Sequence, residues 1–315
     1  MAMDSLFLFA LLIAPEGTVE AAQAHVPGAS LTVEFSEPLP TATANDIVGW
    51  IESAASNVSR VYGRFPNPDA KVIVTPSASR RWGDDSAVYF GRVTRFDGEK
   101  VELFVNPERP MDEFYSDWTA THEFSHLMLP LLNQKYRWIT EGFATYYQNV
   151  LMARGGHYTN EFAWQRLTEG FERGRNSRPD LSPNEATTTR ARDATMKIYW
   201  SGAALALIAD VDLRSRSGGT ESLNSVLDKL QDCCLPARRL WSGPKLFRKL
   251  DALLDDPERP VFMPLYRQIA DDEDFPDIAI LLNDLGVTPG PQPGAPARLN
   301  ASARLSALRA SIMQP

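Results

Sequence analysis

The stretch that decides the fold is His122-Glu123-Phe124-Ser125-His126, an HExxH pattern. In a helix, residues four apart lie on the same face, so both imidazoles can reach one metal ion. Glu123 follows one position after His122 and lies beside a metal-bound water rather than on the metal. The pattern predicts a hydrolytic zinc centre. Because it is only five residues long, an ordinary amphipathic helix is the alternative.

Two predicted helices surround this pattern. The first runs from Met111 to Leu129, and the second runs from Trp138 to Arg154 and opens with the sequence WITEGFATYY. A catalytic zinc needs three protein ligands and an open position for water, so Glu141 is the candidate third ligand beside His122 and His126. The alternative for Glu141 is an ordinary first-turn glutamate, which the helix dipole favours.

The expected chemistry follows from this ligand set. Zinc, one Zn²⁺ per chain, lowers the pKa of a bound water, and Glu123 takes the proton that the water loses. The chain has four histidines, of which the pattern uses two. We interpret the others, His25 and His157, as solvent-exposed, because two histidines and one glutamate already supply the three ligands.

The segment before the pattern is predicted to contain both strands and a helix. Leu31 to Phe35 alternates like a strand, Asn45 to Tyr62 has helical spacing, and Lys71 to Thr75 is a short run typical of a strand. Residues 25–110 are therefore predicted to form an N-terminal α/β lobe.

The segment after the pattern is mainly helical. Further helices are predicted at Met196–Arg214, Ser222–Gln231, Pro244–Leu254 and Phe275–Leu285. The polar stretches 173–193 and 255–260 are predicted surface loops. Residues 111–287 would form a helical catalytic lobe, and residues 288–315 a Pro/Gly-rich linker with a peripheral tail that contains a short amphipathic helix.

The two motifs together resemble a known family. HEFSH followed by WITEGFATYY is similar to the HExxH and WLxEGFAxY pair of the gluzincin zinc metallopeptidases, in particular the alanyl and glycyl aminopeptidases. The resemblance implies an α+β, zincin-like fold of two lobes. A small mixed sheet with helices would form the N-terminal lobe, the C-terminal lobe would be mainly helical, and the active-site helix would lie between them.

The resemblance also covers a later helix. The segment Ile198 to Leu205, IYWSGAAL, resembles the Y-x-K-G helix of those families. By that match, the Tyr199 hydroxyl stabilises the oxyanion of the tetrahedral intermediate. The alternative for Tyr199 is a buried aromatic residue at the start of a helix.

The resemblance is incomplete in the elements that define an aminopeptidase. Fourteen residues separate His126 from Glu141, fewer than in the aminopeptidases, and Ser201 stands where those families have lysine. The G-x-M-E-N sequence that binds a free amino terminus in the alanyl branch is missing. Endopeptidase and exopeptidase modes therefore both remain open.

A hairpin is predicted just before the HExxH helix, with strands at Ala87–Thr94 and Lys100–Asn106 joined by an Asp-Gly turn. Relatives bind extended substrate backbone along a strand that precedes this helix. The resemblance therefore suggests Val101–Val105 as the edge strand that binds substrate, with an edge strand of no function as the alternative.

Composition excludes some classes of partner. The chain of 315 residues has 40 acidic and 32 basic side chains and a net charge of -8, which argues against nucleic acid. The two cysteines, Cys233 and Cys234, are adjacent and form no CxxC metal motif. We interpret them as two small buried apolar side chains, with a disulfide between these neighbours as the alternative.

The first residues resemble an export signal. Leu6 to Ala14 is apolar, and Ala22-Gln23-Ala24 has the form of a signal-peptidase site, although Asp4 precedes the apolar run and no lysine or arginine does. Residues 1–24 are therefore a predicted signal peptide of a periplasmic or secreted protein, with a cytoplasmic protein as the alternative. No apolar run is long enough to be an integral membrane segment.

The sequence thus predicts a zinc-dependent peptidase acting on a peptide or protein substrate. Two alternatives remain: a catalytically inactive module of the same fold that binds peptides, and a zinc hydrolase of a non-peptide substrate. Cleavage specificity and oligomeric state are not predicted.

Overall fold

The computed structural model describes residues 17–77, 86–95, 98–189 and 192–314. Its N-terminal part is a sheet with the strand order β1-β2-β3-β5-β4. The strands are β1 (Thr18–Val26), β2 (Ala29–Pro40), β3 (Lys71–Pro76), β4 (Val88–Thr94) and β5 (Lys100–Val105). β2, β3 and β5 are parallel, whereas β1 and β4 pair antiparallel at the two edges. The predicted mixed sheet and hairpin are confirmed.

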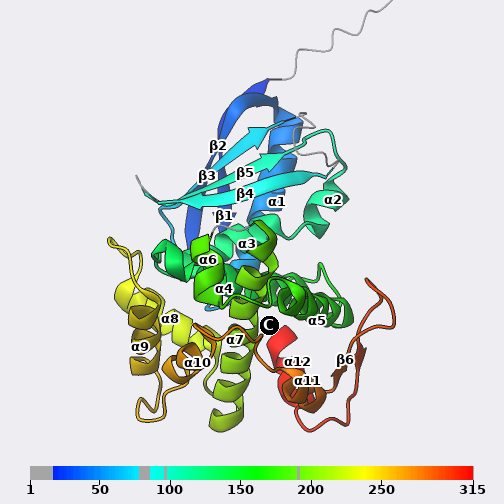
Figure 1. Cartoon of the computed structure of the whole chain (residues 1–315). Helices are drawn as coiled ribbons and strands as arrows, with labels where there is room; N and C mark the ends of the chain where they lie inside the picture. The colour runs from blue at the N-terminus through cyan, green and yellow to red at the C-terminus, as the bar shows by residue number, and fades with distance from the viewer. Residues whose placement is uncertain (1–16, 78–85, 96–97, 190–191, 315) are drawn as a thin grey trace, which may run out of the picture.

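One face of the sheet is buried. The strands β3 and β5 alternate, so that Val72, Val74, Val101, Leu103 and Val105 are buried while their neighbours are partly exposed. Helix α1 (Thr41–Ser59) and helix α3 (Thr119–Ser125) cover the sheet. The HExxH segment is therefore held between the sheet and the helical part of the chain, as Figure 1 shows.

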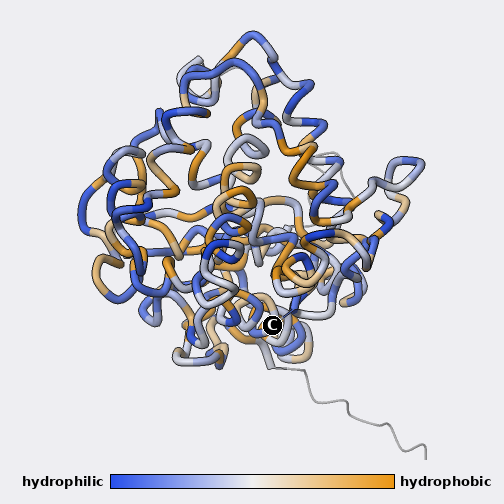
Figure 2. The backbone as a smooth tube through the Cα atoms, turned by 90° about the horizontal axis from the view of Figure 1, so that it is seen from below, coloured by the Kyte–Doolittle hydropathy of each residue, from blue (hydrophilic) through white to orange (hydrophobic). Residues whose placement is uncertain are grey.

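The rest of the chain is mainly helical. Its elements are α2 (Met111–Ser116), the 3₁₀ turns η2 (His126–Met128), η3 (Gln134–Tyr136) and η4 (Arg192–Ala194), α4 (Arg137–Arg154), α5 (Asn160–Asn176), α6 (Pro183–Thr189), α7 (Thr195–Ser217), α8 (Leu223–Cys234), α9 (Gly243–Ala252), α10 (Phe262–Ile269), α11 (Ala279–Leu285), the short strands β6 (Val287–Thr288) and β7 (Arg298–Leu299), and α12 (Ser306–Met313). Viewed from below, apolar stretches lie within the helical part and hydrophilic ones follow its peripheral loops (Figure 2). The predicted two-lobe α+β fold is confirmed.

The predicted helix 111–129 is interrupted. Asp117 has an extended backbone between α2 and α3, and its carboxylate accepts a hydrogen bond from the Thr119 amide at 2.7 Å. This local bond satisfies a backbone group at the start of α3 and competes with a continuous helix. The HExxH helix is consequently short, and His126 begins the 3₁₀ turn η2.

The predicted loop 173–193 contains the end of α5 and all of α6. The hydroxyl of Ser182 accepts from the Glu185 amide, and the Glu185 carboxylate accepts from the Ser182 amide. This reciprocal pair, with Pro183 as the first residue of α6, is a capping box that the sequence Ser-Pro-Asn-Glu already contains. The loop prediction was wrong because polar composition outweighed this signal.

The C-terminal tail is not peripheral, contrary to the prediction. In α12, Ile312 and Met313 are buried, and the Ile312 carbonyl accepts from Arg154 Nε of α4. The tail also reaches α7, where Arg214 donates to Ser311. The last helix is therefore part of the helical core.

The proposed cleavage site lies within the sheet. Residues 22–24 belong to β1, where Ala24 is buried and pairs with Leu31 of β2. Cleavage after Ala24 would remove most of this strand. The apolar run Leu6 to Ala14 lies outside the described residues, and the signal peptide stays a prediction.

None of the helices in the described part of the chain combines the length and the apolar character needed to cross a bilayer.

The interpretation of the cysteines as buried side chains was wrong, because Cys233 is exposed and Cys234 is only partly buried. Cys233 and Cys234 at the end of α8 are joined by a disulfide between adjacent residues.

Candidate metal centre

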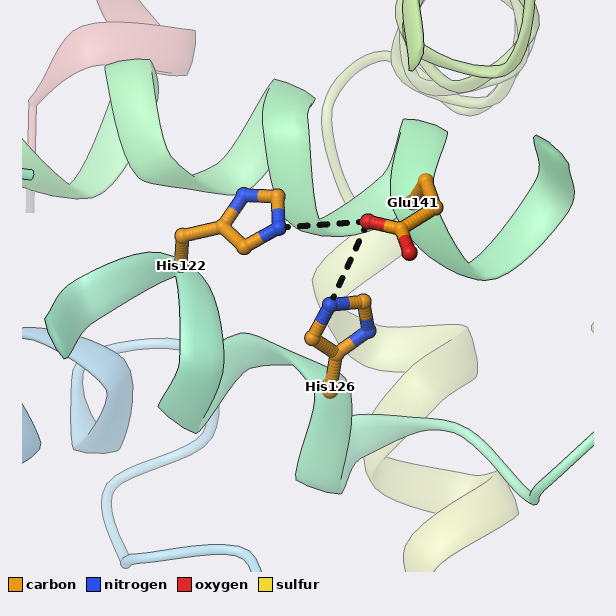
Figure 3. A group of neighbouring side chains, drawn as sticks. All are labelled: His122, His126 and Glu141. Carbon is orange, nitrogen blue, oxygen red and sulfur yellow. Dashed lines mark ion pairs between the residues drawn. The ribbon is translucent and has the colours of Figure 1, made fainter. Parts of the chain in front are cut away.

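The two imidazoles and the carboxylate meet at one point. Glu141 Oε2 lies 3.4 Å from His122 Nε2 and 3.6 Å from His126 Nε2, and Figure 3 shows both rings turned toward this oxygen. Bonds of about 2.0–2.1 Å to a tetrahedral ion put ligand atoms about 3.3–3.4 Å apart. Both distances therefore suit zinc, and the three donor atoms lie within 4.8 Å of one another, as in a potential metal site.

Close packing of two glycines positions the helices around this site. A Cβ on Gly142 of α4 would lie 2.2 Å from the Gly202 Cα of α7, and a Cβ on Gly202 would lie 2.2 Å from the Trp138 carbonyl oxygen. Larger residues would push the helices apart. This close approach brings Glu141 of α4 near Tyr199 of α7.

A buried amide orients the first histidine. Gln148 Oε1 lies 2.7 Å from His122 Nδ1, and Gln148 is about two helical turns beyond Glu141 on α4. A carbonyl oxygen at this distance fixes the proton on Nδ1 and leaves the Nε2 lone pair for a metal. Trp118 packs edge-on against the same ring. Sequence analysis missed Gln148, because a glutamine in the middle of a helix carries no signal by itself.

An arginine from the hairpin holds the end of the HExxH segment. Arg95 donates to the backbone carbonyls of His126 at 2.6 Å and Leu129 at 2.9 Å, and it forms an ion pair with Glu99. These carbonyls lie where the HExxH segment ends, and the His126 carbonyl also accepts from the Leu129 amide of the 3₁₀ turn. Arg95 therefore fixes the backbone of His126, a role that only the folded chain reveals.

The charges of the site depend on burial and on the neighbouring imidazoles. Burial by itself would raise the pKa of Glu141, but hydrogen bonds from His122 and His126 outweigh it and hold that pKa well below its ordinary value. Burial raises the pKa of Glu123, with the two imidazoles opposing the rise. Glu141 is thus a stable carboxylate, whereas Glu123 is a stronger base than an exposed glutamate.

The edge strand beside Glu123 is β4, not the predicted Val101–Val105. Strand β5, which contains those residues, lies between β3 and β4. Gly91 of β4 comes so close to the helix that a Cβ there would lie 2.5 Å from Glu123 Cγ. The prediction was wrong because sequence order does not determine which hairpin strand lies at the edge.

Tyr199 of α7 lies against the first histidine of the site. Its ring stacks parallel to that of His122 with a centroid distance of 5.9 Å. Burial and the Glu141 carboxylate raise the pKa of Tyr199, although the charge of Arg137 opposes the rise. The phenol therefore stays protonated and able to donate a hydrogen bond.

A cleft of about 340 Å³ opens onto these residues. It is lined by Phe90, Gly91, Arg92, Val93, Arg95, Glu123, His126, Pro130, Leu131, Leu132, Gln134, Arg137, Thr140, Glu141 and Tyr199. One wall comes from β4 and another from the loop between the two motif helices. An extended chain could follow β4, the last strand on this side of the described sheet, past Glu123.

The two remaining histidines lie outside the site. His25 is exposed on β1, as expected. His157 is half-buried beyond α4, where Nε2 lies 3.2 Å from the Ser53 hydroxyl and burial lowers its pKa. Its interpretation as a solvent-exposed histidine was therefore only partly right.

Comparisons with known proteins agree with this fold. Residues 131–205, which include Glu141 and Tyr199 but not the HExxH segment, match the model of the M61 glycyl aminopeptidase family. An aminopeptidase N family protein from Idiomarina loihiensis superposes with a TM-score of 0.62 at 14% identity, covering 85% of this chain and 49% of that one. A search of curated protein sequences finds no match.

Two other solved structures have the same fold. A variant of the M1 zinc metallopeptidase from Deinococcus radiodurans, bound to a Tyr-Ser-Ala substrate, gives a TM-score of 0.52 at 14% identity and covers 83% of this chain and 52% of that one. Native yeast LTA4 hydrolase gives 0.53 at 11% identity, with 84% and 42% covered. This chain thus spans about half the length of these proteins. In its fold it resembles the gluzincin zinc metallopeptidases.

Proposed function

We propose that this protein is a zinc-dependent peptidase. The observation that carries the proposal is the placement of three donor atoms from two helices at spacings that suit one tetrahedral ion. His122, His126 and Glu141 would hold the metal. Zinc, when bound, would polarise the scissile carbonyl and lower the pKa of water.

The residues of the chain supply the remaining steps. Glu123, buried beside the histidines, accepts a proton from the attacking water and passes it to the leaving amine. Tyr199, whose phenol stays protonated, donates a hydrogen bond to the oxyanion. Strand β4, the edge strand of the described sheet, binds the substrate backbone next to Glu123.

The proposal is tested by comparing wild type with two variants. We expect about one zinc per wild-type chain by mass spectrometry, zinc retained with nearly all peptide turnover lost in Glu123→Gln, and zinc lost in Glu141→Ala. A tenth or more of wild-type turnover in Glu123→Gln would show that this carboxylate is not the base, since loss of general-base catalysis costs about 10²–10⁴-fold.

The two alternatives predict other results. An inactive peptide-binding module would bind peptides without cleaving them, but the intact, buried Glu123 beside the donors favours an enzyme. A hydrolase of another substrate would bind zinc and need Glu123, yet would not cleave any member of a peptide library. Profiling amides, esters and peptides with the same preparation separates these cases.

We further propose that the protein is exported, from the apolar run Leu6–Ala14 and the Ala22-Gln23-Ala24 site. N-terminal sequencing of protein from the periplasm or medium tests this proposal. A cytoplasmic product with an uncleaved N-terminus would refute it.

A further inference from the structure

Arg137 is an arginine of the cleft that forms no ion pair with any of the described residues. It is the first residue of α4 and lies one helical turn before Glu141, so both side chains line the cleft with Tyr199. Its Nε is buried and makes no hydrogen bond in the described structure. Buried polar groups are nearly always paired, and an unpaired one calls for an explanation.

The other two arginines of the cleft differ in this respect. Arg92 forms an ion pair with Glu102, and Arg95 pairs with Glu99 while donating to two backbone carbonyls. No ion pair of the Arg137 side chain occurs among residues 17–77, 86–95, 98–189 and 192–314. Within these residues, the charge of Arg137 is therefore available to a ligand.

The carboxylates of the cleft are already engaged. Glu141 contacts both histidines, and Glu123 lies beside them as the proposed base. Among the described lining residues no other is acidic. This described part of the cleft thus offers a substrate an available cation but no available anion, which disfavours an α-amino group as the anchor of the substrate.

Arg137 is also close to the reacting groups. Its side chain lines the same cleft as Glu123, Glu141 and Tyr199. The planar guanidinium can donate two parallel hydrogen bonds to a carboxylate, and such charge-assisted pairs are stronger than neutral ones. A carboxylate near the scissile bond would satisfy both the charge and the donors of Arg137.

We propose that Arg137 selects peptide substrates that present a carboxylate close to the scissile bond. This inference rests on the proposed peptidase function and specifies its substrate. The carboxylate can come from an aspartate or glutamate side chain or from the C-terminus of a short peptide. Both sources have the same chemistry, and the experiment distinguishes them.

The test uses the full chain loaded with zinc and two matched peptide series. The first has amidated C-termini and carries glutamate or glutamine at each position around the cleaved bond. The second has neutral side chains and a free or amidated C-terminus. We expect kcat/KM to be about ten- to a hundredfold higher for the charged member of one series, because charge-assisted hydrogen bonds have this effect.

Variants of the cleft arginines assign the preference to Arg137. Arg137→Gln should reduce the charged-to-neutral ratio to about one and keep zinc bound, whereas Arg137→Lys should retain part of the preference. Arg92→Gln, which removes a paired arginine of the same cleft, should keep the wild-type ratio. A wild-type ratio of one in both series overturns the inference, even if Arg137→Gln does not fold.

A binding measurement separates failure of this inference from failure of the proposed function. If no peptide is cleaved by the zinc-loaded wild type, the peptidase proposal fails. Calorimetric titration of Glu123→Gln with the same peptides then still tests Arg137. Tighter binding of the charged peptides supports carboxylate recognition, and equal binding overturns it.

Discussion

At the scale of single residues, the orientation of the candidate ligand His122 depends on a neighbouring side chain. Its Nδ1 faces Gln148 Oε1 at 2.7 Å, and its Nε2 faces Glu141 Oε2 at 3.4 Å. Gln148 thus fixes the ring at Nδ1, and Nε2 on the other side of the ring can bind the metal. The sequence pattern predicts the ring but not the amide that orients it.

We expect Gln148→Ala to weaken zinc binding by about 10- to 100-fold, the usual effect of losing such a partner. The loss follows because His122 could then rotate or change its tautomer. Competition with a chelator of known zinc affinity measures the change. Gln148→Glu keeps an acceptor at the same position and should restore most of the affinity, and equal affinities in wild type and Gln148→Ala would contradict this role.

At the scale of elements, the start of α3 depends on Asp117. Its carboxylate accepts from the Thr119 amide, and burial raises its pKa from an ordinary value of 3.8 to about 6. Because the pKa is higher in the folded state, the folded protein holds this proton more tightly than the unfolded chain does. The stability from this group is full below pH 3.8 and is lost as the pH rises through about 6.

Asp117→Asn should therefore gain stability relative to wild type as the pH rises. The asparagine oxygen still accepts from Thr119 but carries no charge. We expect the difference in free energy of unfolding to grow by up to about 3 kcal/mol between pH 4 and pH 7. Urea denaturation at both pH values measures it. Asp112→Asn, at an exposed position on α2, is the control, and a constant difference for Asp117→Asn would refute the argument.

At the scale of the whole molecule, the last helix completes the core. Ile312 of α12 is fully buried at 0% exposure, and its carbonyl accepts from Arg154 of α4, the helix that carries Glu141. The C-terminus thus supports the helix that holds one candidate ligand. A short amphipathic segment after a Pro/Gly-rich linker gives no indication of this packing.

Ile312→Ala should lower the free energy of unfolding by about 2–5 kcal/mol, as buried isoleucine truncations do. Urea denaturation of the full chain measures the loss. Ile280→Ala is the matched control, because Ile280 of α11 is 73% exposed and its truncation should change little. Equal effects of the two substitutions would mean that α12 does not belong to the core.

The sequence by itself determined the HExxH and Glu141 candidates, the α+β class and most element positions. These follow from local patterns: spacing on a helix face, alternation in strands and a tight Asp-Gly turn. Helix α6 was also encoded locally, in the Ser182–Glu185 capping box, but was overlooked.

Only the tertiary structure decided the rest. The edge position of β4, the orientation of His122 by Gln148, the Arg95 bonds to His126 and the unpaired Arg137 all join residues far apart in the chain. Which strand lies at an edge and which side chain lacks a partner depend on the packing of the whole chain. Local propensity and spacing carry no information about such contacts.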